Sequence, residues 1–216
     1  MLGTSFVDNC SFYITVIIFY SSHIKIYMKH IVIFASGSGT NAQHITEYFS
    51  DSAIARVIMI YSNCADAYVL QRANKMDIPT VVFDKADFYE NNLVYDQLEK
   101  LNPDLIVLAG FLWKVPEKIV RIFPKQIINI HPALLPKYGG KGMYGVNVHR
   151  AIIENREKES GITIHYVNEN YDKGAIILQA RCVVNLNDTP ESLAKRVHAL
   201  EYKYYPQTIE QVLLRN

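Results

Sequence analysis

The residues with the clearest chemical potential are Asn129 and His131, two positions apart at the end of the apolar run QIINIH. Alternate side chains of a strand share a face, so the amide and the imidazole would lie together while Ile128 and Ile130 point the other way. Pro132 favours an extended backbone at His131. An amide that can bind a developing oxyanion, beside an imidazole that exchanges protons near neutral pH, suits acyl transfer. A capping Asn and a half-buried His would explain the same spacing.

A carboxylate that could serve His131 lies in the polar loop 168–174. In isolation, Asp172 is an ordinary turn residue. Within a few ångströms of His131 it would stabilise the imidazolium and raise its pKa. His131, His165 and Asp172 could also be drawn as metal ligands, but no short His-x-x-x-His spacing supports this arrangement. We therefore predict no metal site.

A glycine-rich turn, SGSGTN (36–41), follows the apolar run HIVIFA and precedes residues with helical spacing. Such a turn lets backbone N–H groups approach a phosphate at a helix N-terminus. Gly37-x-Gly39-x-x-Ala42 also satisfies the loose dinucleotide fingerprint. A dinucleotide site normally has an acidic residue at the end of the second strand, where it binds the ribose. This chain has YSN (61–63) there, which argues against a dehydrogenase. A tight turn without a ligand is the plain alternative.

The elements around these residues alternate between strand and helix. Apolar runs at 30–35, 55–62, 78–83 and 104–110 alternate with helical spacing at 42–49, 69–76 and 92–101, which predicts a parallel sheet with helices on both faces. A short helix at 116–123, a strand at 126–131, a helix near 147–155 and strands at 161–167 and 175–184 follow. Asp188 and Glu191 have capping-box spacing at the start of a final helix.

Composition narrows the function. Half of the 216 residues are hydrophobic, 20% are charged and the formal net charge is +1, which is typical of a folded domain without a basic surface for nucleic acid or membrane. We therefore expect small-molecule partners. Three widely spaced cysteines favour a reducing cytoplasm over a disulfide framework.

The first residues are treated separately. The apolar stretch 12–20 is too short to span a bilayer, and it lacks the basic start and the cleavage site of a secretory signal. We interpret 1–27 as a non-native or disordered N-terminal extension and 28–216 as a single domain. A real leader or an interfacial anchor is the alternative reading.

From about Met28 nearly to its end, the chain resembles the folate-dependent phosphoribosylglycinamide formyltransferases. The resemblance rests on several long motifs in the same order: FASGSGTN, YSNCADAYVLQRA, PDLIVLAGFL, INIHPALLPKYGGKG, GITIHYVNENYDKGAIILQA, and a final helix with His198, Glu201 and Pro206. It implies a Rossmann-like open sheet with a parallel N-terminal half and mixed C-terminal strands.

The resemblance also implies roles for individual residues. The family's catalytic trio falls on Asn129, His131 and Asp172. Contacts to the glycinamide ribotide fall on Gly39, Thr40, Asn41, His198 and Glu201. The folate-binding residues would be Leu112, Trp113, Lys114, Val115, Asn129, Asn168, Glu169, Asn170, Tyr171 and Asp172. Trp113 stands where many members have Arg, and no Arg for the folate tail is evident near Asn91, which puts the tail contacts in question.

The implied reaction transfers the formyl group of 10-formyltetrahydrofolate, as cosubstrate, to the amine of 5-phosphoribosylglycinamide in purine biosynthesis. Formyltetrahydrofolate hydrolase and other folate-dependent formyltransferases share the trio and are the alternatives. The hydrolase would be expected to carry an extra N-terminal domain, and a tRNA formylase an extra C-terminal one. We expect a cytoplasmic monomer or homodimer that needs no metal.

Overall fold

The computed structural model describes residues 27–215 and contains, within them, one seven-stranded sheet of order β3-β2-β1-β4-β5-β6-β7. The first five strands in the chain pair in parallel, whereas β6 pairs antiparallel with both β5 and β7. The predicted parallel half and mixed C-terminal strands are therefore confirmed. The strands are β1 (Lys29–Phe34), β2 (Ala55–Ser62), β3 (Thr80–Val82), β4 (Leu105–Leu108), β5 (Ile127–His131), β6 (Glu159–Tyr166) and β7 (Ile176–Val183). Residues 1–26 of the predicted extension lie outside the described residues.

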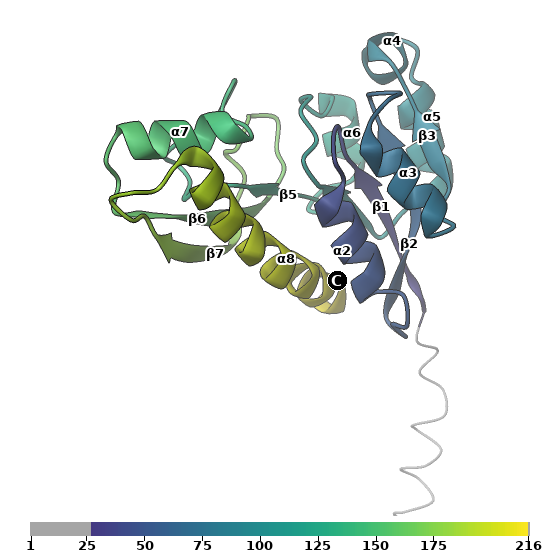
Figure 1. Cartoon of the computed structure of the whole chain (residues 1–216). Coiled ribbons are helices and arrows are strands. Elements are labelled where there is room, and N and C mark those ends of the chain that lie inside the picture. Colours follow the sequence, from purple (N-terminus) through teal and green to yellow (C-terminus); the bar gives the residue numbers. More distant parts are fainter. Residues whose placement is uncertain (1–26, 216) are drawn as a thin grey trace, which may run out of the picture.

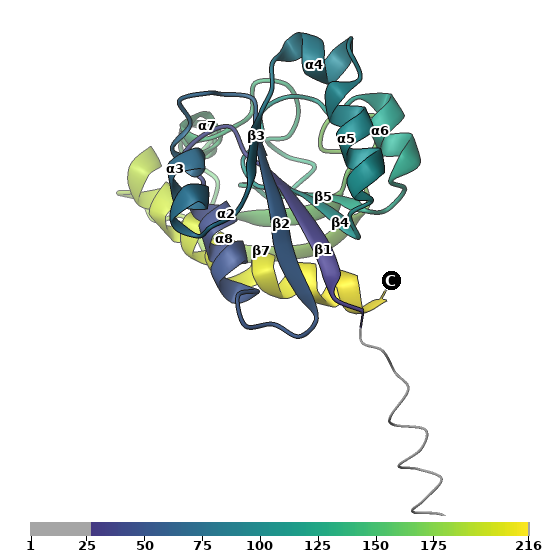
Figure 2. The ribbon, with the colours of Figure 1, turned by 90° about the vertical axis from the view of Figure 1, so that its right-hand side faces the viewer.

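Helices cover both faces of the sheet. Figure 2 shows α4, α5 and α6 on one side of β1 and β4, and α2, α3 and α8 on the other. The helices are α2 (Thr40–Tyr48), α3 (Tyr68–Lys75), α4 (Lys85–Tyr89), α5 (Leu93–Leu101), α6 (Glu117–Ile122), α7 (Val146–Glu154) and α8 (Pro190–Arg215). No helix in this part of the chain is both long and apolar enough to cross a membrane.

The apolar strands divide their side chains between two cores. Along β1, Ile31 and Ile33 belong to the core beneath α2 and α8, while Val32 and Phe34 belong to the core beneath α5 and α6. All four side chains are buried. A strand covered on both faces needs no polar alternation, which is why its sequence reads as a continuous apolar run.

The strand order creates the crevice in which the site lies. After β1 the chain moves outward through β2 to β3, then returns to place β4 on the other side of β1. Loops that leave the carboxyl ends of β1 and β4 therefore turn in opposite directions and open a gap between them. The glycine turn follows β1, and the Gly110–Phe111 pair follows β4.

Two details differ from the sequence expectation. The capping box of α8 is formed by Thr189 and Ser192, whose backbone N–H groups each donate to the other's hydroxyl at 3.0 and 3.3 Å, so the predicted Asp188–Glu191 box is wrong by one residue. Asp188 instead accepts two hydrogen bonds at 2.9 Å from Arg196, which lies eight residues further along the chain in α8. Helix α4 was not predicted.

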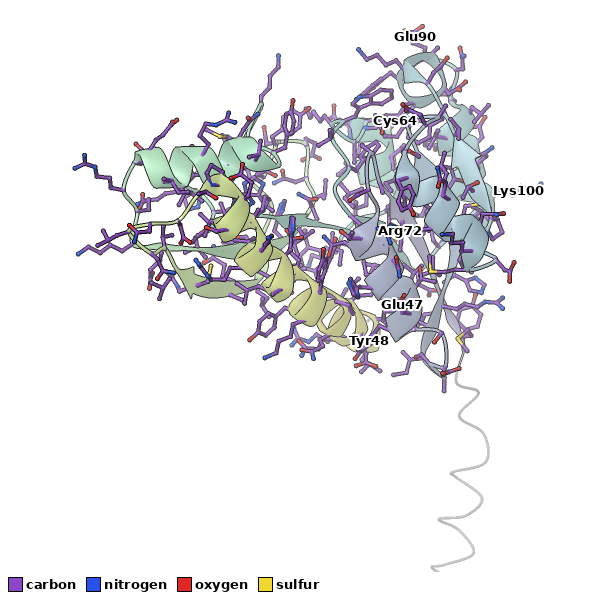
Figure 3. All side chains as sticks on the ribbon, viewed as in Figure 1. Glu47, Tyr48, Cys64, Arg72, Glu90 and Lys100 are labelled. Carbon is purple, nitrogen blue, oxygen red and sulfur yellow. The ribbon has the colours of Figure 1, made fainter. Side chains whose placement is uncertain are left out.

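The two ends of the described fold lie at the same end of the sheet. In Figures 1 and 2, the beginning of β1 and the end of α8 both lie in the lower part of the molecule, away from the carboxyl ends of the parallel strands. Figure 1 also shows α8 crossing the molecule diagonally, from α7 to α2. Tyr48 of α2, labelled in Figure 3, ties the two helices by donating to Glu210 of α8 at 2.8 Å.

Candidate active site

A cavity of 680 Å³ opens at the carboxyl ends of β1, β4 and β5. Every residue predicted for the site lines this cavity except Glu169, which is exposed. The structure thus gathers segments that lie up to 165 positions apart, from Ser36 to Glu201, around one space. The predicted residues that line it are Gly39, Thr40, Asn41, Leu112, Trp113, Lys114, Val115, Asn129, His131, Asn168, Asn170, Tyr171, Asp172, His198 and Glu201.

Strand β5 places Asn129 and His131 on the cavity side, as their spacing predicted. Ile128 and Ile130, which alternate with them, join the core on the other face. His131 is only 4% exposed, whereas Asn129 is half-buried. The amide and the imidazole are therefore neighbours on one face of the strand, and the imidazole is almost fully withdrawn from solvent.

Both nitrogens of His131 face protein groups. Nε2 lies 2.7 Å from the backbone oxygen of Tyr138, which can only accept, so Nε2 is the nitrogen that donates. Nδ1 lies 3.7 Å from Oδ2 of Asp172, too far for a hydrogen bond but close enough for charge attraction. The trio predicted from the sequence is therefore assembled in space.

The expectation that Asp172 raises the pKa of His131 above its ordinary value is wrong in its net result. Burial lowers this pKa most strongly, and the nearby His165 lowers it further. Asp172 and the Tyr138 carbonyl each raise it, but together they do not offset burial. In the ligand-free protein at neutral pH, His131 is therefore mainly neutral.

Asp172 is held by a turn of unusual backbone geometry. Its φ of 51° lies in the left-handed region, and its Oδ2 accepts a hydrogen bond from Gly140 N at 2.8 Å. Its Oδ1 lies 3.6 Å from Nε2 of His165. Burial opposes ionisation, but His165, the Gly140 N–H group and His131 together outweigh it, so the pKa of Asp172 is lowered. Asp172 is an anion at neutral pH.

His165 is a site residue that the sequence suggested only as a metal ligand. It faces Asn129 across the antiparallel β5–β6 pair. Its Nδ1 lies 2.8 Å from the Tyr166 backbone oxygen and donates to it, while its Nε2 lies 3.2 Å from Asn129 Nδ2 and 3.6 Å from Asp172 Oδ1. His165 therefore lies beside both the Asn129 amide and the Asp172 carboxylate. Within residues 27–215, no group of three or more His, Cys, Asp or Glu side chains could hold a metal ion.

The glycine turn has the geometry of a phosphate cradle. Gly39 precedes α2 at a φ of 71°, and a Cβ there would lie 2.4 Å from Val69 Cγ2, so only glycine fits. No side chain caps the N-terminus of α2, which leaves its first N–H groups free. Arg72, labelled in Figure 3, supports the turn without lining the cavity, since its Nε donates to the Ser38 backbone oxygen at 2.8 Å.

Asn41 and Glu201 join the glycine turn to α8. Asn41 Nδ2 donates to Glu201 Oε2 at 2.8 Å, while Asn41 Oδ1 is buried without a hydrogen-bond partner. Burial raises the pKa of Glu201, although Asn41 and His198 oppose that rise. The pair forms a buried polar wall of the cavity, in which Asn41 Oδ1 can still accept a hydrogen bond.

The segment from Leu112 to Val115 forms the opposite wall. Its backbone is tied to the glycine-turn side by Leu112 N, which donates to Ser36 Oγ at 3.0 Å. The Trp113 ring packs about 6 Å from the rings of Phe83 and Tyr89. The Lys85 ammonium lies 6.0 Å from the centre of the Trp113 ring. This end of the cavity is therefore aromatic, with a cation beside it.

His149 of α7 is a further cavity residue that the sequence did not reveal. Its side chain is buried, and its Nδ1 has no hydrogen-bond partner. Burial first, and then the charges of His198 and His131, lower its pKa to about 4. No spacing pattern marks it, because it reaches the site only through the packing of α7 against α8.

The chain is a formyl transferase by class: a family profile described as "Formyl transferase" matches residues 29–209. The open α/β sheet, with an amide and an imidazole on β5 and a carboxylate in the loop after β6, agrees with that class. The phosphoribosylglycinamide formyltransferase of Haemophilus influenzae is 40% identical over 188 residues, which cover 85% of this chain and 86% of that protein. The chain belongs to the phosphoribosylglycinamide formyltransferase family.

Three further relatives agree with this assignment. The glycinamide ribonucleotide transformylase 1 of Symbiobacterium toebii has a solved structure that is 34% identical, with a TM-score of 0.79 over 86% of this chain and 88% of that one. The chloroplastic phosphoribosylglycinamide formyltransferase of Arabidopsis thaliana is 43% identical over 187 residues, which cover 84% of this chain. The chain spans 64% of the length of that plant protein and 62% of the one from Vigna unguiculata.

Proposed function

We propose that this protein transfers the formyl group of 10-formyltetrahydrofolate to the amine of 5-phosphoribosylglycinamide, a step of purine biosynthesis. The observation that carries the proposal is the single cavity that joins the glycine turn, the trio and the segment 112–115. One substrate can reach the trio from the phosphate cradle while the other reaches it from the aromatic wall. No metal enters the proposal.

We assign the ribotide to the side of the cavity formed by α2 and α8. Its phosphate would accept hydrogen bonds from the N–H groups of Gly39, Thr40 and Asn41, beside the partial positive charge of the α2 N-terminus. Glu201 and His198, which face the same cavity from α8, would contact the rest of the ribotide. The polar wall formed by Asn41 and Glu201 suits hydroxyl groups better than an apolar ring.

We assign the folate to the opposite side. Its ring system would lie between the segment 112–115 and the loop from Asn168 to Asp172, with Tyr171 exposed at the mouth of the cavity. Glu169, which is exposed and does not line the cavity, is the weakest of the proposed contacts. Trp113 stands where many family members have Arg. At this end of the site, the Trp113 ring and the nearby Lys85 ammonium would contact the folate in place of that Arg.

The geometry supports an acyl transfer that begins with neutral His131. The substrate amine attacks the formyl carbon, and the Asn129 amide, which lies 3.2 Å from His165, would donate a hydrogen bond to the resulting oxyanion. His131 Nδ1 takes the proton that the amine nitrogen loses and passes it to the folate nitrogen as the C–N bond to folate breaks. Asp172 stabilises the transient imidazolium. The resting His131 is thus a base, whereas the sequence led us to expect that Asp172 would raise its pKa.

The test is turnover of 10-formyltetrahydrofolate by the purified protein, with and without the ribotide. Formylated ribotide and tetrahydrofolate should appear in equal amounts, and only when the ribotide is present. Equal folate turnover in its absence would instead show a hydrolase, in which water replaces the amine. Formylation of methionyl-tRNA in place of the ribotide would also overturn the proposal.

We further propose that the domain 28–216 works as a monomer or a homodimer in the cytoplasm and takes only small molecules. The small net charge of +1 and the absence of a basic run in the sequence support the exclusion of nucleic acid. Light scattering of the purified protein measures its oligomeric state. Microscopy of a tagged full chain measures its location, which is chloroplastic for the Arabidopsis relative.

A further inference from the structure

One short loop holds both His131 and Asp172 through its backbone. In the loop 137–140, the carbonyl of Tyr138 accepts the hydrogen bond from His131 Nε2 at 2.7 Å, and the N–H group of Gly140 donates to Asp172 Oδ2 at 2.8 Å. The path of this loop therefore decides where the imidazole and the carboxylate sit relative to each other. A loop displacement of an ångström would weaken both contacts together.

The loop also packs directly against Asp172. A Cβ built on Gly139 would lie 2.6 Å from Leu135 Cδ2 and 3.3 Å from Asp172 Cβ, so the backbone here leaves no space for a side chain. Tyr138 has a φ of 57°, a left-handed conformation that is unfavourable for a tyrosine. Such a conformation persists only where surrounding contacts hold it.

The contacts that hold Tyr138 lie on the outer side of the loop. Its hydroxyl donates to Glu157 Oε1 at 3.0 Å, and the Lys137 ammonium donates to the same oxygen at 2.8 Å. Glu157 lies in the turn between α7 and β6, on a different part of the fold. Hydrogen bonds from Lys137 and Tyr138 lower the pKa of Glu157, so it is an ionised acceptor. The Tyr138 side chain is thus fixed at its far end.

We propose that Tyr138 and Glu157 are positioning residues that select Nδ1 of His131 as its reacting nitrogen. The inference rests on the proposed function. By holding the Tyr138 carbonyl against Nε2–H, the pair keeps neutral His131 in the Nε2–H tautomer. Nδ1, which faces Asp172 at 3.7 Å, is then the nitrogen with a free lone pair for the substrate amine. Without the anchor, the imidazole can populate the other tautomer, in which Nδ1 carries the proton and cannot act as a base.

The test compares variants that differ in this anchor alone. Tyr138→Phe removes the hydroxyl but keeps the backbone carbonyl, and Glu157→Ala removes its acceptor. Glu157→Gln keeps an oxygen at that place and should restore the anchor. Lys137→Met is the matched control, because Lys137 is 68% exposed, meets the same oxygen and does not touch His131. We expect Tyr138→Phe and Glu157→Ala to lower kcat by about 10-fold, with KM for the ribotide nearly unchanged, and the other two to behave as wild type.

A second readout does not depend on the reaction. Nitrogen NMR of histidine-labelled protein should show His131 as the Nε2–H tautomer in the wild type and as a mixture of tautomers in Tyr138→Phe and Glu157→Ala. The His131 titration should also move to lower pH, since the Tyr138 carbonyl raises its pKa. A purely structural role for the pair would lower the melting temperature without changing the tautomer.

The outcomes separate the inference from the proposed function. If the wild type does not formylate the ribotide, the proposed function fails, and the tautomer measurement still decides whether the pair fixes His131. If Tyr138→Phe keeps both kcat and the Nε2–H tautomer, the inference is overturned. If Tyr138→Phe does not fold, Glu157→Ala and Glu157→Gln decide, and equal kcat for these two overturns it.

Discussion

Replacing Asp172 with Asn tests how charge controls the reacting imidazole. The change removes the anion 3.7 Å from His131 Nδ1 but keeps the side-chain size, and the amide oxygen can still accept from Gly140. Burial already lowers the pKa of His131, and Asp172 is the strongest influence that raises it. The pKa of His131 in the variant should therefore fall further, and the histidine should bind a proton only at lower pH.

The size of the effect follows from the geometry. Two unit charges 3.7 Å apart attract by about 4.5 kcal/mol at an effective dielectric of about 20, which is an upper bound on the support that Asp172 gives to the imidazolium. The Asp172 side chain is 13% exposed, and its other oxygen faces His165 at 3.6 Å, so part of this attraction is screened or shared. We expect the pKa of His131 to fall below its value in the wild type, because this attraction is lost. The imidazolium formed during turnover loses the same support, so kcat should fall on the order of 100-fold.

The assay follows the His131 ring by NMR across pH in the wild type and in Asp172→Asn, with the signal identified by its loss in His131→Gln. Measuring the imidazole directly avoids confusion with the substrate amine, which must also be neutral to react. Asp188→Asn is the control, because it removes a carboxylate that pairs with Arg196 outside the cavity. A His131 midpoint that stays in place or rises in Asp172→Asn would refute the proposed electrostatic link.

Three other predictions follow from the site and the fold. Asn129→Ala should lower kcat by about 100-fold to 1,000-fold, because the amide meets a charge that exists only in the transition state, and a change confined to KM would make it a binding residue. Gly39→Ala should cost at least about 1 kcal/mol in urea unfolding, because its φ is 71° and the new Cβ would lie 2.4 Å from Val69. Gly37→Ala, with no atom within 4 Å of the new Cβ, should be tolerated, so equal unfolding midpoints for these two glycine variants would contradict the argument. A chain that begins at Met28 should keep the melting temperature and kcat of the full chain, because β1 starts one residue later; a loss of either would show that the preceding residues contribute.

The general fold could be predicted because its signals are local. Apolar runs, helical spacing and a glycine turn each occupy a few consecutive residues, and together they define a strand–helix alternation. The local signal fails where two neighbouring residues could each begin the same helix-capping motif. Asp188 and Thr189 can both begin a capping box, and the structure uses Thr189, because Asp188 is engaged by Arg196 instead.

The site could be predicted only in part. Asn129 and His131 share one strand, so their spacing was sufficient to place them together. His165 contacts Asn129 because β5 and β6 pair, which the sequence alone does not show. Tyr138 contacts His131 through a backbone carbonyl, and the pattern of side chains in a sequence does not reveal backbone contacts. The net pKa of His131 was predicted in the wrong direction, because a sequence shows the possible charge partner but not the depth of burial that outweighs it.

Both ends of the described fold lie at one end of the sheet (Figure 2), which makes this protein suited to rearrangement of its chain order. A linker from the end of α8 to the start of β1 would close the polypeptide into a ring without crossing the cavity, because the residues that line the cavity lie at the opposite, carboxyl ends of the parallel strands. New ends could then be opened in an exposed turn, such as the one after β7 near Leu186. The same geometry allows the protein to be tethered to a surface at either end of the described fold while its cavity stays open.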